Sequence, residues 1–416
     1  MEGLHAGQRG VLRRPRLARW RGEARRHRQG PRADRGAAPA GARGALSRPP
    51  GVPPRRPQLP DFPWDALVPY SERAAAHPDG IVDLSVGTPV DPTPEVVRHA
   101  LAAAADAPGY PTTVGTPALR EAAVRWLARR AGAVALDPGA VIPSIGSKEL
   151  VAWLPTLLGL GPGDAVVFPE LAYPTYDIGA RLAGADPVAS DSVTALGPRR
   201  VGLIWVNSPA NPHGRVLPAA HLAKVVDWAR ERGAVVASDE CYLELGWEER
   251  PVSILDPAVN GGSLDGLLAV HSLSKRSNLA GYRAGFVAGD PALIRQVLEV
   301  RKHAGLMVPT PVQAAMTAAL DDDAHVEEQR SRYARRRDVL RAALAEAGFR
   351  IDHSTAGLYL WATRDQPCWD TVGWLADRGI LAAPGAFYGA AGGSHVRIAL
   401  TATDERVDAA AKRLTA

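Results

Sequence analysis

Short apolar runs alternate with helix-length segments through the middle of the chain. Helical patterns occupy 147–159, 174–183 and 218–232. The apolar runs before, between and after them lie at 140–143, 165–168, 201–206, 234–237 and 267–270. Short, uninterrupted apolar strands separated by helices are typical of a mostly parallel sheet covered by helices on both faces. The pattern therefore predicts an α/β fold with a large central sheet.

A different pattern flanks this region. Segment 59–95 holds an aromatic, proline-punctuated stretch and a short apolar run. From about residue 310, long charged helices precede two strand-like runs, 357–363 and 395–400. We predict a large α/β domain at 96–310 and a smaller α+β domain at 311–416, against which 59–95 packs.

The beginning of the chain differs in composition from the rest. Residues 1–56 hold fifteen arginines, no lysine and three acidic residues, a net charge of +12, which leaves −7 for the remainder of a chain whose total is +5. Such a stretch has too little apolar periodicity to bury a core, so we expect 1–58 to be a disordered basic tail. A nucleic-acid arm, an inert tail and a mis-set translation start, with the natural start near Leu46 or Val52, are the open interpretations, and we favour the third.

Composition narrows the class of protein. The 416 residues are 46% hydrophobic and 22% charged, which suits a large folded core. No stretch approaches the ~18 uninterrupted apolar residues of a membrane span. Two cysteines, Cys241 and Cys368, make neither a secreted disulfide framework nor a zinc site. We expect a cytoplasmic protein with no membrane or nucleic-acid partner and no metal.

Lys275 stands in the stretch HSLSKRSNLAGYRAG, directly after the apolar run 267–270. A strand there delivers the lysine to the carboxyl end of the sheet, where the sites of α/β proteins form. A desolvated lysine amine can form a Schiff base with an aldehyde cofactor. Ser272, Ser274 and Arg283 supply anion-binding groups beside it. The aldehyde cofactor that carries a phosphate is pyridoxal 5′-phosphate.

Two other strand ends carry further parts of such a site. Asp239 follows the run 234–237 and can pair with a pyridinium nitrogen, which keeps the ring protonated and able to accept electrons. Tyr242, three residues later, can donate a hydrogen bond to the 3′ oxygen of the ring. Asn211 lies in a proline-stiffened loop after 201–206 and can reach the same oxygen.

Three more features complete the predicted site. The backbone amides of Gly146, Ser147 and Lys148 open a helix directly after a strand and can bind a phosphate. Tyr173 offers a ring to stack on the pyridine. Arg397, on a strand near the C-terminus, offers a planar fork for a carboxylate. The predicted catalytic residues are Lys275, Asp239 and Tyr173.

These motifs resemble those of the fold-type-I, pyridoxal-phosphate-dependent aminotransferases of classes I and II, over about residues 59–416. The family pattern S-x-S-K-x7-R is present from Ser272 to Arg283, N-P-x-G at 211–214, and D-x-x-Y from Asp239 to Tyr242. The resemblance implies that Lys275 also moves the proton between the substrate α-carbon and the cofactor. It implies phosphate contacts from Ser272, Ser147 and Arg283, and substrate α-carboxylate contacts from Arg397 and the backbone at Gly87.

The family is normally a homodimer with its sites at the interface. The resemblance therefore implies a homodimer here as well. It also implies that Tyr110, in GYPTTVGTPALREA, reaches the phosphate bound by the other subunit.

Longer stretches, such as DGIVDLSVGTPVDPTP and SLSKRSNLAGYRAGFVAGD, are similar to actinobacterial N-succinyldiaminopimelate aminotransferases. This likeness implies a reversible ping-pong transfer of the glutamate amino group to N-succinyl-2-amino-6-oxopimelate, in lysine and cell-wall precursor synthesis. Lys148, Arg276 and His213 are candidates for contacts to the additional carboxylates. A class I aminotransferase for aspartate or an aromatic amino acid, and a β-lyase, are alternatives with the same site. A transcription regulator of this fold is disfavoured, because 1–58 is too short and too poor in apolar periodicity for a winged-helix domain.

Overall fold

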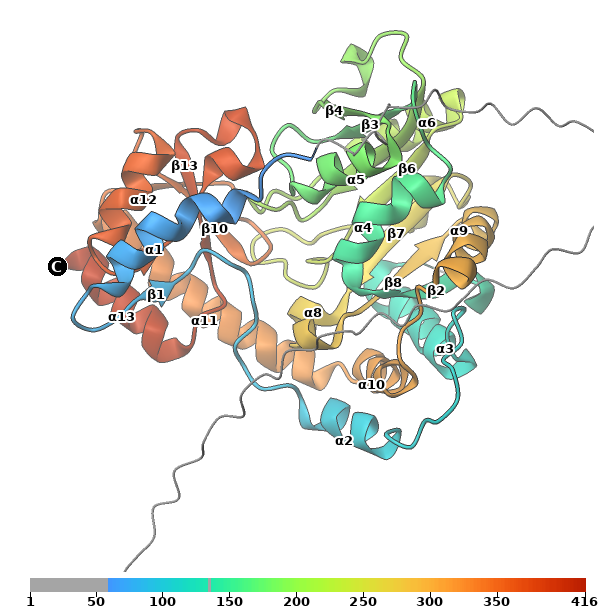
Figure 1. Cartoon of the computed structure of the whole chain (residues 1–416), viewed down its shortest axis with the longest axis horizontal. Coiled ribbons are helices and arrows are strands. Elements are labelled where there is room, and N and C mark those ends of the chain that lie inside the picture. Colours follow the sequence, from blue (N-terminus) through green and yellow to red (C-terminus); the bar gives the residue numbers. More distant parts are fainter. Residues whose placement is uncertain (1–58, 134–135) are drawn as a thin grey trace, which may run out of the picture. The chain divides into compact units, whose positions relative to one another are not determined.

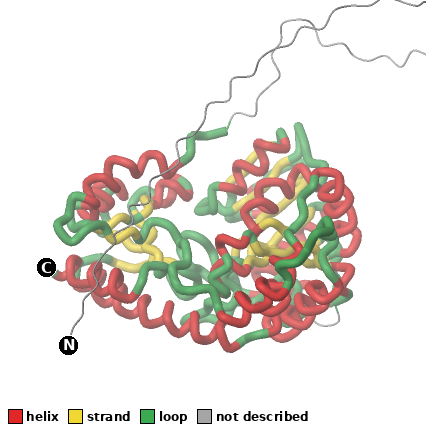
Figure 2. The backbone as a smooth tube through the Cα atoms, turned by 60° about the horizontal axis from the view of Figure 1, so that its bottom comes forward, coloured by secondary structure: helices red, strands yellow, loops and turns green. Residues whose placement is uncertain are grey.

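The computed structural model describes residues 59–133 and 136–416. The tail predicted at 1–58 lies outside the described residues. All described residues belong to one unit of internal contacts, Arg56–Ala416, so the domain boundaries at 96 and 311 stay predictions. The strands of this unit fall into two main sheets, each with its own helices (Figures 1 and 2).

The larger sheet has seven strands in the order β2-β8-β7-β6-β5-β3-β4. They are β2 (Val141–Ile145), β3 (Ala165–Phe168), β4 (Asp186–Ala189), β5 (Val201–Asn207), β6 (Val235–Asp239), β7 (Leu267–Ser272) and β8 (Ala284–Gly289). Strand β8 runs antiparallel to both of its neighbours, β2 and β7, whereas the other pairings of this sheet are parallel. The predicted mostly parallel central sheet is therefore confirmed.

Helices cover both faces of this sheet. In β5, Ile204 and Val206 pack into the core beneath α3, α6 and α10, and Leu203 and Trp205 into the core beneath α4, α5 and α9. Because alternate residues of a strand face opposite sides, burial on both faces requires an uninterrupted apolar run. The helices around this sheet are α2 (Glu95–Ala103), α3 (Pro117–Trp126), α4 (Gly146–Leu157), α5 (Thr175–Ala183), α6 (Ala219–Arg232), α7 (Pro257–Asn260), α8 (Leu273–Arg276), α9 (Pro291–Ala304) and α10 (Thr310–Asp321).

The smaller sheet is antiparallel, with the order β12-β13-β10-β9. Its strands are β9 (Arg350–Asp352), β10 (Tyr359–Thr363), β12 (Ala383–Pro384) and β13 (His395–Ala399). Helices α11 (Ala324–Glu346), α12 (Cys368–Ala376) and α13 (Asp404–Thr415) contribute side chains to its core.

The N-terminal segment of the described chain joins the smaller sheet's core. Strand β1 (Val82–Asp83) pairs in parallel with β11 (Ile380–Leu381). Leu67, just before α1 (Val68–Ala75), is buried in the same core. Figure 1 shows α1, in blue, beside the red C-terminal elements. Among the described residues, no helix combines the length and the apolar character needed to cross a membrane.

Candidate active site

The strand ends of the larger sheet bring the predicted residues to one edge. Asn207, the last residue of β5, is the register partner of Asp239, the last residue of β6. Strand β7 continues past this level to Ser272, which is opposite Gly285 of β8, and Gly285 is in turn opposite Ser144 of β2. Residues that lie far apart in the sequence therefore meet where the carboxyl ends of parallel strands open.

Lys275 lies in α8, a single helical turn that begins where β7 ends. The Ser272 hydroxyl caps this turn by accepting a hydrogen bond from the Ser274 amide, at 3.2 Å. The Lys275 amine donates to the carbonyl of Gly87, the residue whose backbone is predicted to contact the substrate α-carboxylate. The Ser272 hydroxyl thus holds the backbone of the turn through the Ser274 amide, and the amine of Lys275 points across to the N-terminal segment.

The surroundings of Lys275 favour its neutral form. Burial lowers the pKa of the amine, and the positive charges of Arg397 and Arg283 lower it further. A neutral amine is nucleophilic and can accept a proton, whereas an ammonium group can do neither.

Asp239 is a buried carboxylate without a positive partner in the described chain. Its Oδ2 accepts a hydrogen bond from the Tyr176 hydroxyl at 2.8 Å, and its Oδ1 accepts one from the Cys241 amide at 3.2 Å. Burial raises the pKa of Asp239. A buried carboxylate is costly unless it is paired, so the site is suited to a cation next to this group, as a protonated ring nitrogen would be.

Tyr173 lies on the same side of the sheet as Asp239. Its ring packs edge-on against Tyr176, with the ring centroids 5.9 Å apart. Burial raises the pKa of Tyr173 to about 12, and the Asp239 charge adds to this rise. The hydroxyl therefore stays protonated, and the ring is available as an apolar face beside the carboxylate.

Arg397 reaches the site from β13 of the smaller sheet. Its side chain is 3% exposed, and in the described chain it has no acidic partner. Its Nη1 donates to Asn211 Oδ1 at 2.9 Å, and its Nη2 donates to the Ser85 carbonyl at 2.6 Å. Among the described residues, its Nε has no hydrogen-bond partner. A buried guanidinium that only neutral groups hold in place is suited to binding a carboxylate.

Tyr359 is a residue of the site that the sequence analysis missed. Its hydroxyl oxygen lies 3.1 Å from that of Tyr242, and its ring lies 3.9 Å from the guanidinium carbon of Arg397. A Cβ atom at position 87 would clash with the Tyr359 hydroxyl, which explains why Gly87 is a glycine. Burial alone would raise the pKa of Tyr359, but the charges of Arg397 and Lys275 outweigh it and lower the pKa.

The predicted phosphate cradle lies at the N-terminus of α4. Gly146 has a φ of +73°, and a Cβ there would clash with the guanidinium of Arg283. A Cβ on Gly285 would lie 3.1 Å from the Ser147 amide. Two glycines thus allow backbone amides and an arginine to approach one another closely, which is the donor set that a phosphate requires. The Cys241 thiol donates to the Ser147 hydroxyl at 3.3 Å and joins this cradle to the loop after β6.

Several candidate residues lie away from this group. Tyr110 is 98% exposed. The Lys148 side chain is exposed, and its amine lies 5.9 Å from the centre of the Phe62 ring. His213 lies beside His353, with the ring centroids 5.5 Å apart, and burial lowers its pKa to about 4, so its ring is neutral.

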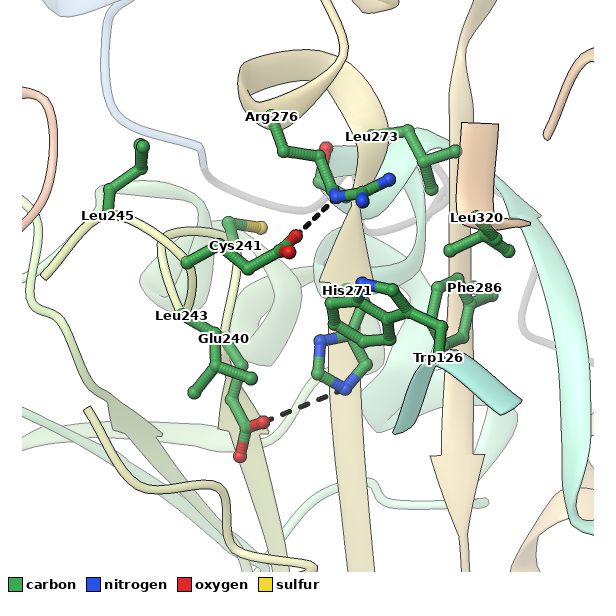
Figure 3. A pocket seen from close by; sticks show the side chains of 12 residues that line it. Trp126, Glu240, Cys241, Leu243, Leu245, His271, Leu273, Arg276, Phe286 and Leu320 are labelled. Carbon is green, nitrogen blue, oxygen red and sulfur yellow. Dashed lines mark hydrogen bonds and ion pairs between the residues drawn. The ribbon is translucent and has the colours of Figure 1, made fainter. Parts of the chain in front are cut away.

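Arg276 has a different role from the predicted one. It is buried near Trp126 and His271 (Figure 3) and forms an ion pair with Glu244. Next to this pair lies a cavity of about 10 Å³, lined also by Trp126, His271 and Glu240, which is space for about one water molecule. The charge of Arg276 is therefore neutralised inside the protein, and Arg276 is a wrong candidate for a substrate carboxylate.

The buried charges provide a test of whether a charged cofactor fits. Asp239 and Arg397 are both buried without an ionic partner in the described chain, and the Lys275 amine donates to the neutral carbonyl of Gly87. The cradle formed by Gly146, Ser147 and Arg283 supplies amide and guanidinium donors for an anion. A group with a phosphate, an aldehyde and a protonated ring nitrogen fits the cradle, the Lys275 amine and the Asp239 carboxylate, and it leaves Arg397 for the carboxylate of a substrate.

Comparison with known proteins identifies the family. The model of the family "Aminotransferase class I and II" matches residues 79–414. The chain belongs to this family. The predicted fold-type-I architecture and the predicted aminotransferase activity are both confirmed. Enzymes of this family and fold depend on pyridoxal 5′-phosphate, which is therefore the cofactor.

The relatives of this aminotransferase differ in their substrates. A 4-dedimethylamino-4-oxo-anhydrotetracycline transaminase of Streptomyces rimosus is 67% identical over 86% of this chain and 99% of its own length. A probable aminotransferase of Mycobacterium tuberculosis is 60% identical over 100% of both chains. An LL-diaminopimelate aminotransferase of Aquifex aeolicus is 35% identical over 80% of this chain and 90% of its own length.

Solved structures agree with this family. An aminotransferase from Neisseria meningitidis superposes with a TM-score of 0.79 at 32% identity, and the match covers 86% of this chain and 97% of that one. An aspartate aminotransferase variant from Thermus thermophilus superposes with a TM-score of 0.78 at 25% identity, over 88% of this chain and 99% of that one.

Proposed function

We propose that this aminotransferase moves the amino group of glutamate to N-succinyl-2-amino-6-oxopimelate, forming 2-oxoglutarate and N-succinyl-LL-2,6-diaminopimelate, reversibly. The observation that best supports an α-amino acid as the substrate is the environment of Arg397. This arginine is a buried cation beside Lys275, and only neutral groups of the described chain hold it. An α-carboxylate bound there would place the α-carbon next to the lysine amine.

The proposed catalytic residues have different roles, which follow from their charges. Pyridoxal 5′-phosphate, when bound, supplies an aldehyde that captures an amine and a ring that accepts the electron pair released at the substrate α-carbon. Lys275 Nζ, whose pKa burial lowers, accepts the proton from that carbon in its neutral form and returns it. Asp239 holds a negative charge where the ring nitrogen would lie, and Tyr173 covers a face of the ring.

The remaining proposed contacts hold the cofactor and the substrate in position. Gly146, Ser147 and the Lys148 amide at the start of α4, with Ser272 and Arg283, hold the phosphate. Asn211 and Tyr242 hold the 3′ oxygen, and Arg397 with the Gly87 backbone holds the substrate α-carboxylate. These contacts would align the substrate α-carbon with the cofactor and with Lys275, so that the reaction takes place between groups that are already in position.

Two observations bear on the choice of acceptor. Relatives named LL-diaminopimelate aminotransferases, 31% to 35% identical, support an acceptor that yields a diaminopimelate derivative. The relative at 67% identity, a 4-dedimethylamino-4-oxo-anhydrotetracycline transaminase, supports a fused-ring ketone as a second candidate. Both candidates share the glutamate half-reaction, so only the second half distinguishes them.

The test separates the two half-reactions. The holoenzyme is first treated with L-glutamate, freed of small molecules, and then given one acceptor at a time, with the aminated product measured by mass spectrometry. We expect kcat/KM for N-succinyl-2-amino-6-oxopimelate to exceed that for oxaloacetate, phenylpyruvate and the anhydrotetracycline ketone by at least ~100-fold. A higher value for any of the other three would replace this proposal, and Lys275→Ala is the inactive control.

We also propose that the enzyme works in the cytoplasm as a homodimer. Tyr110 is almost fully exposed in the single chain, as a residue that contacts a second copy would be. Equilibrium sedimentation should give twice the chain mass of 44.0 kDa. Tyr110→Phe should weaken phosphate binding without dissociating the dimer. A monomer that is fully active would contradict both statements.

A further inference from the structure

Tyr388 carries a buried hydroxyl that nothing in the described chain satisfies. The residue ends the turn Gly385–Tyr388, between β12 and β13, and is 3% exposed. No residue that the structure describes bonds to its hydroxyl. Most buried hydroxyl groups in folded proteins are paired, because an unpaired one loses its bonds to water without replacement. An exception beside an active site indicates a partner that arrives with a ligand.

This hydroxyl belongs to the surroundings of Arg397. The guanidinium carbon of Arg397 lies 4.9 Å from the centre of the Tyr388 ring and 3.9 Å from that of the Tyr359 ring, so two tyrosines flank the guanidinium. Arg397 Nε is also buried and has no hydrogen-bond partner within residues 59–133 and 136–416. The described chain thus leaves an unpaired hydroxyl on a tyrosine whose ring lies beside a guanidinium with an unpaired Nε.

The backbone holds Tyr388 in this place. Its carbonyl accepts a hydrogen bond of 2.8 Å from the Ala172 amide, next to Tyr173. Its ring packs edge-on against Trp361 of β10, with the centroids 6.2 Å apart. Burial raises the pKa of Tyr388, so its hydroxyl stays protonated and can donate.

We propose that the Tyr388 hydroxyl donates a hydrogen bond to the substrate carboxylate that Arg397 binds. This inference rests on the proposed placement of the α-carboxylate at Arg397. One carboxylate has two oxygens, and it can accept from Arg397 Nε and from the Tyr388 hydroxyl at the same time. Tyr388 is in this account a substrate-binding residue that takes no part in proton transfer.

The neighbouring tyrosine provides a matched control. Tyr359 also flanks Arg397, but its hydroxyl already has a partner, the hydroxyl of Tyr242. Tyr388→Phe removes an unpaired hydroxyl, and Tyr359→Phe removes a paired one. If Tyr388 were only structural, the two variants would lose stability alike. If Tyr388 serves the substrate, only Tyr359→Phe weakens the fold.

The experiment measures stability and the first half-reaction of each full-length variant. The urea midpoint of Tyr388→Phe apoprotein should equal or exceed that of the unaltered protein, whereas that of Tyr359→Phe should be lower. For Tyr388→Phe, we expect the concentration of L-glutamate that gives half the maximal single-turnover rate to rise about 10- to 100-fold, with a much smaller fall in the maximal rate. L-alanine should show the same factor, because it has the α-carboxylate of glutamate and lacks the side-chain carboxylate.

Three results would overturn this proposal. The first is an unchanged half-saturating concentration of L-glutamate for Tyr388→Phe, and the second is a urea midpoint lowered as in Tyr359→Phe. The third is a weaker apparent affinity for glutamate but not for alanine, which would assign the hydroxyl to the side-chain carboxylate. The assay uses only the donor amino acids. A failure with N-succinyl-2-amino-6-oxopimelate would therefore end the proposed acceptor and leave the test of Tyr388 intact.

Discussion

The ion pair between Arg276 and Glu244 gives a prediction whose size follows from burial. Arg276 is the residue after Lys275, and the two paired side chains are only 5% and 9% exposed. Replacing Glu244 with glutamine leaves the guanidinium buried and uncompensated. Breaking a buried pair in this way costs about 3–5 kcal/mol. That is a large part of the ~5–15 kcal/mol that holds a typical domain together.

The same substitution should also disturb Lys275. The turn α8 is only four residues long, and Arg276 Nη1 anchors it by donating to the Ala319 carbonyl at 3.0 Å. When its ionic partner is lost, Arg276 can move toward water and take the turn with it. We therefore expect Glu244→Gln apoprotein to capture pyridoxal 5′-phosphate more slowly as well as to unfold at lower urea.

The assay is urea unfolding of the apoprotein, with a control at the surface. Glu327 also pairs with an arginine, Arg130, at 3.1 Å, but its side chain is 56% exposed. Exposed pairs contribute at most about 1 kcal/mol, so Glu327→Gln should change little. The double variant Glu244→Leu/Arg276→Met should recover stability but not the rate of cofactor capture. A Glu244→Gln protein as stable as the Glu327→Gln control would refute the reasoning.

Two further variants test charge at other places. Asp239→Asn should lower turnover about 10²- to 10³-fold or more, because a buried charge pair worth ~3–5 kcal/mol is lost; steady-state kinetics that show less than a tenfold fall would contradict this. Asp352 forms an ion pair with Arg350 and accepts from His395, and these bonds lower its pKa to about 2. The Asp352 carboxylate therefore contributes its full stabilisation of the fold at pH values above ~3.9, its pKa in the unfolded chain. This contribution is lost as the pH falls toward 2. After allowance for solvent exposure, Asp352→Asn should cost about 1 kcal/mol at pH 6, and the difference should shrink by pH 3 in urea titrations; a difference independent of pH would exclude this role.

The strands buried on both faces could be predicted from the sequence, and the half-exposed ones could not. The apolar run at 165–168 coincides with β3, and that at 267–270 lies within β7 (Leu267–Ser272). Strand β4 (Asp186–Ala189) is at the edge of the sheet and has no fully buried residue, so it leaves no apolar run. Strand β8 has two glycines and follows β7 without a long helix, so the strand–helix alternation gave no signal for it.

The same distinction applies to the site. Lys275, Asp239 and Asn211 were found because each follows a strand of one parallel sheet, and such strand ends gather at one edge. Tyr359 and Tyr388 belong to the smaller sheet, and how that sheet packs against the first follows from no local pattern. The only signal was the strand alternation in GLYLWAT, which places Tyr359 and Trp361 on one face.

The central claim is that the amine of Lys275 holds pyridoxal 5′-phosphate covalently. The direct measurement is borohydride reduction of the purified holoenzyme, followed by digestion and mass spectrometry of the peptide around position 275. We predict a pyridoxyl group on Lys275, and none when L-glutamate is added before the reduction. A peptide without that mass, in protein supplied with the cofactor, would contradict the account.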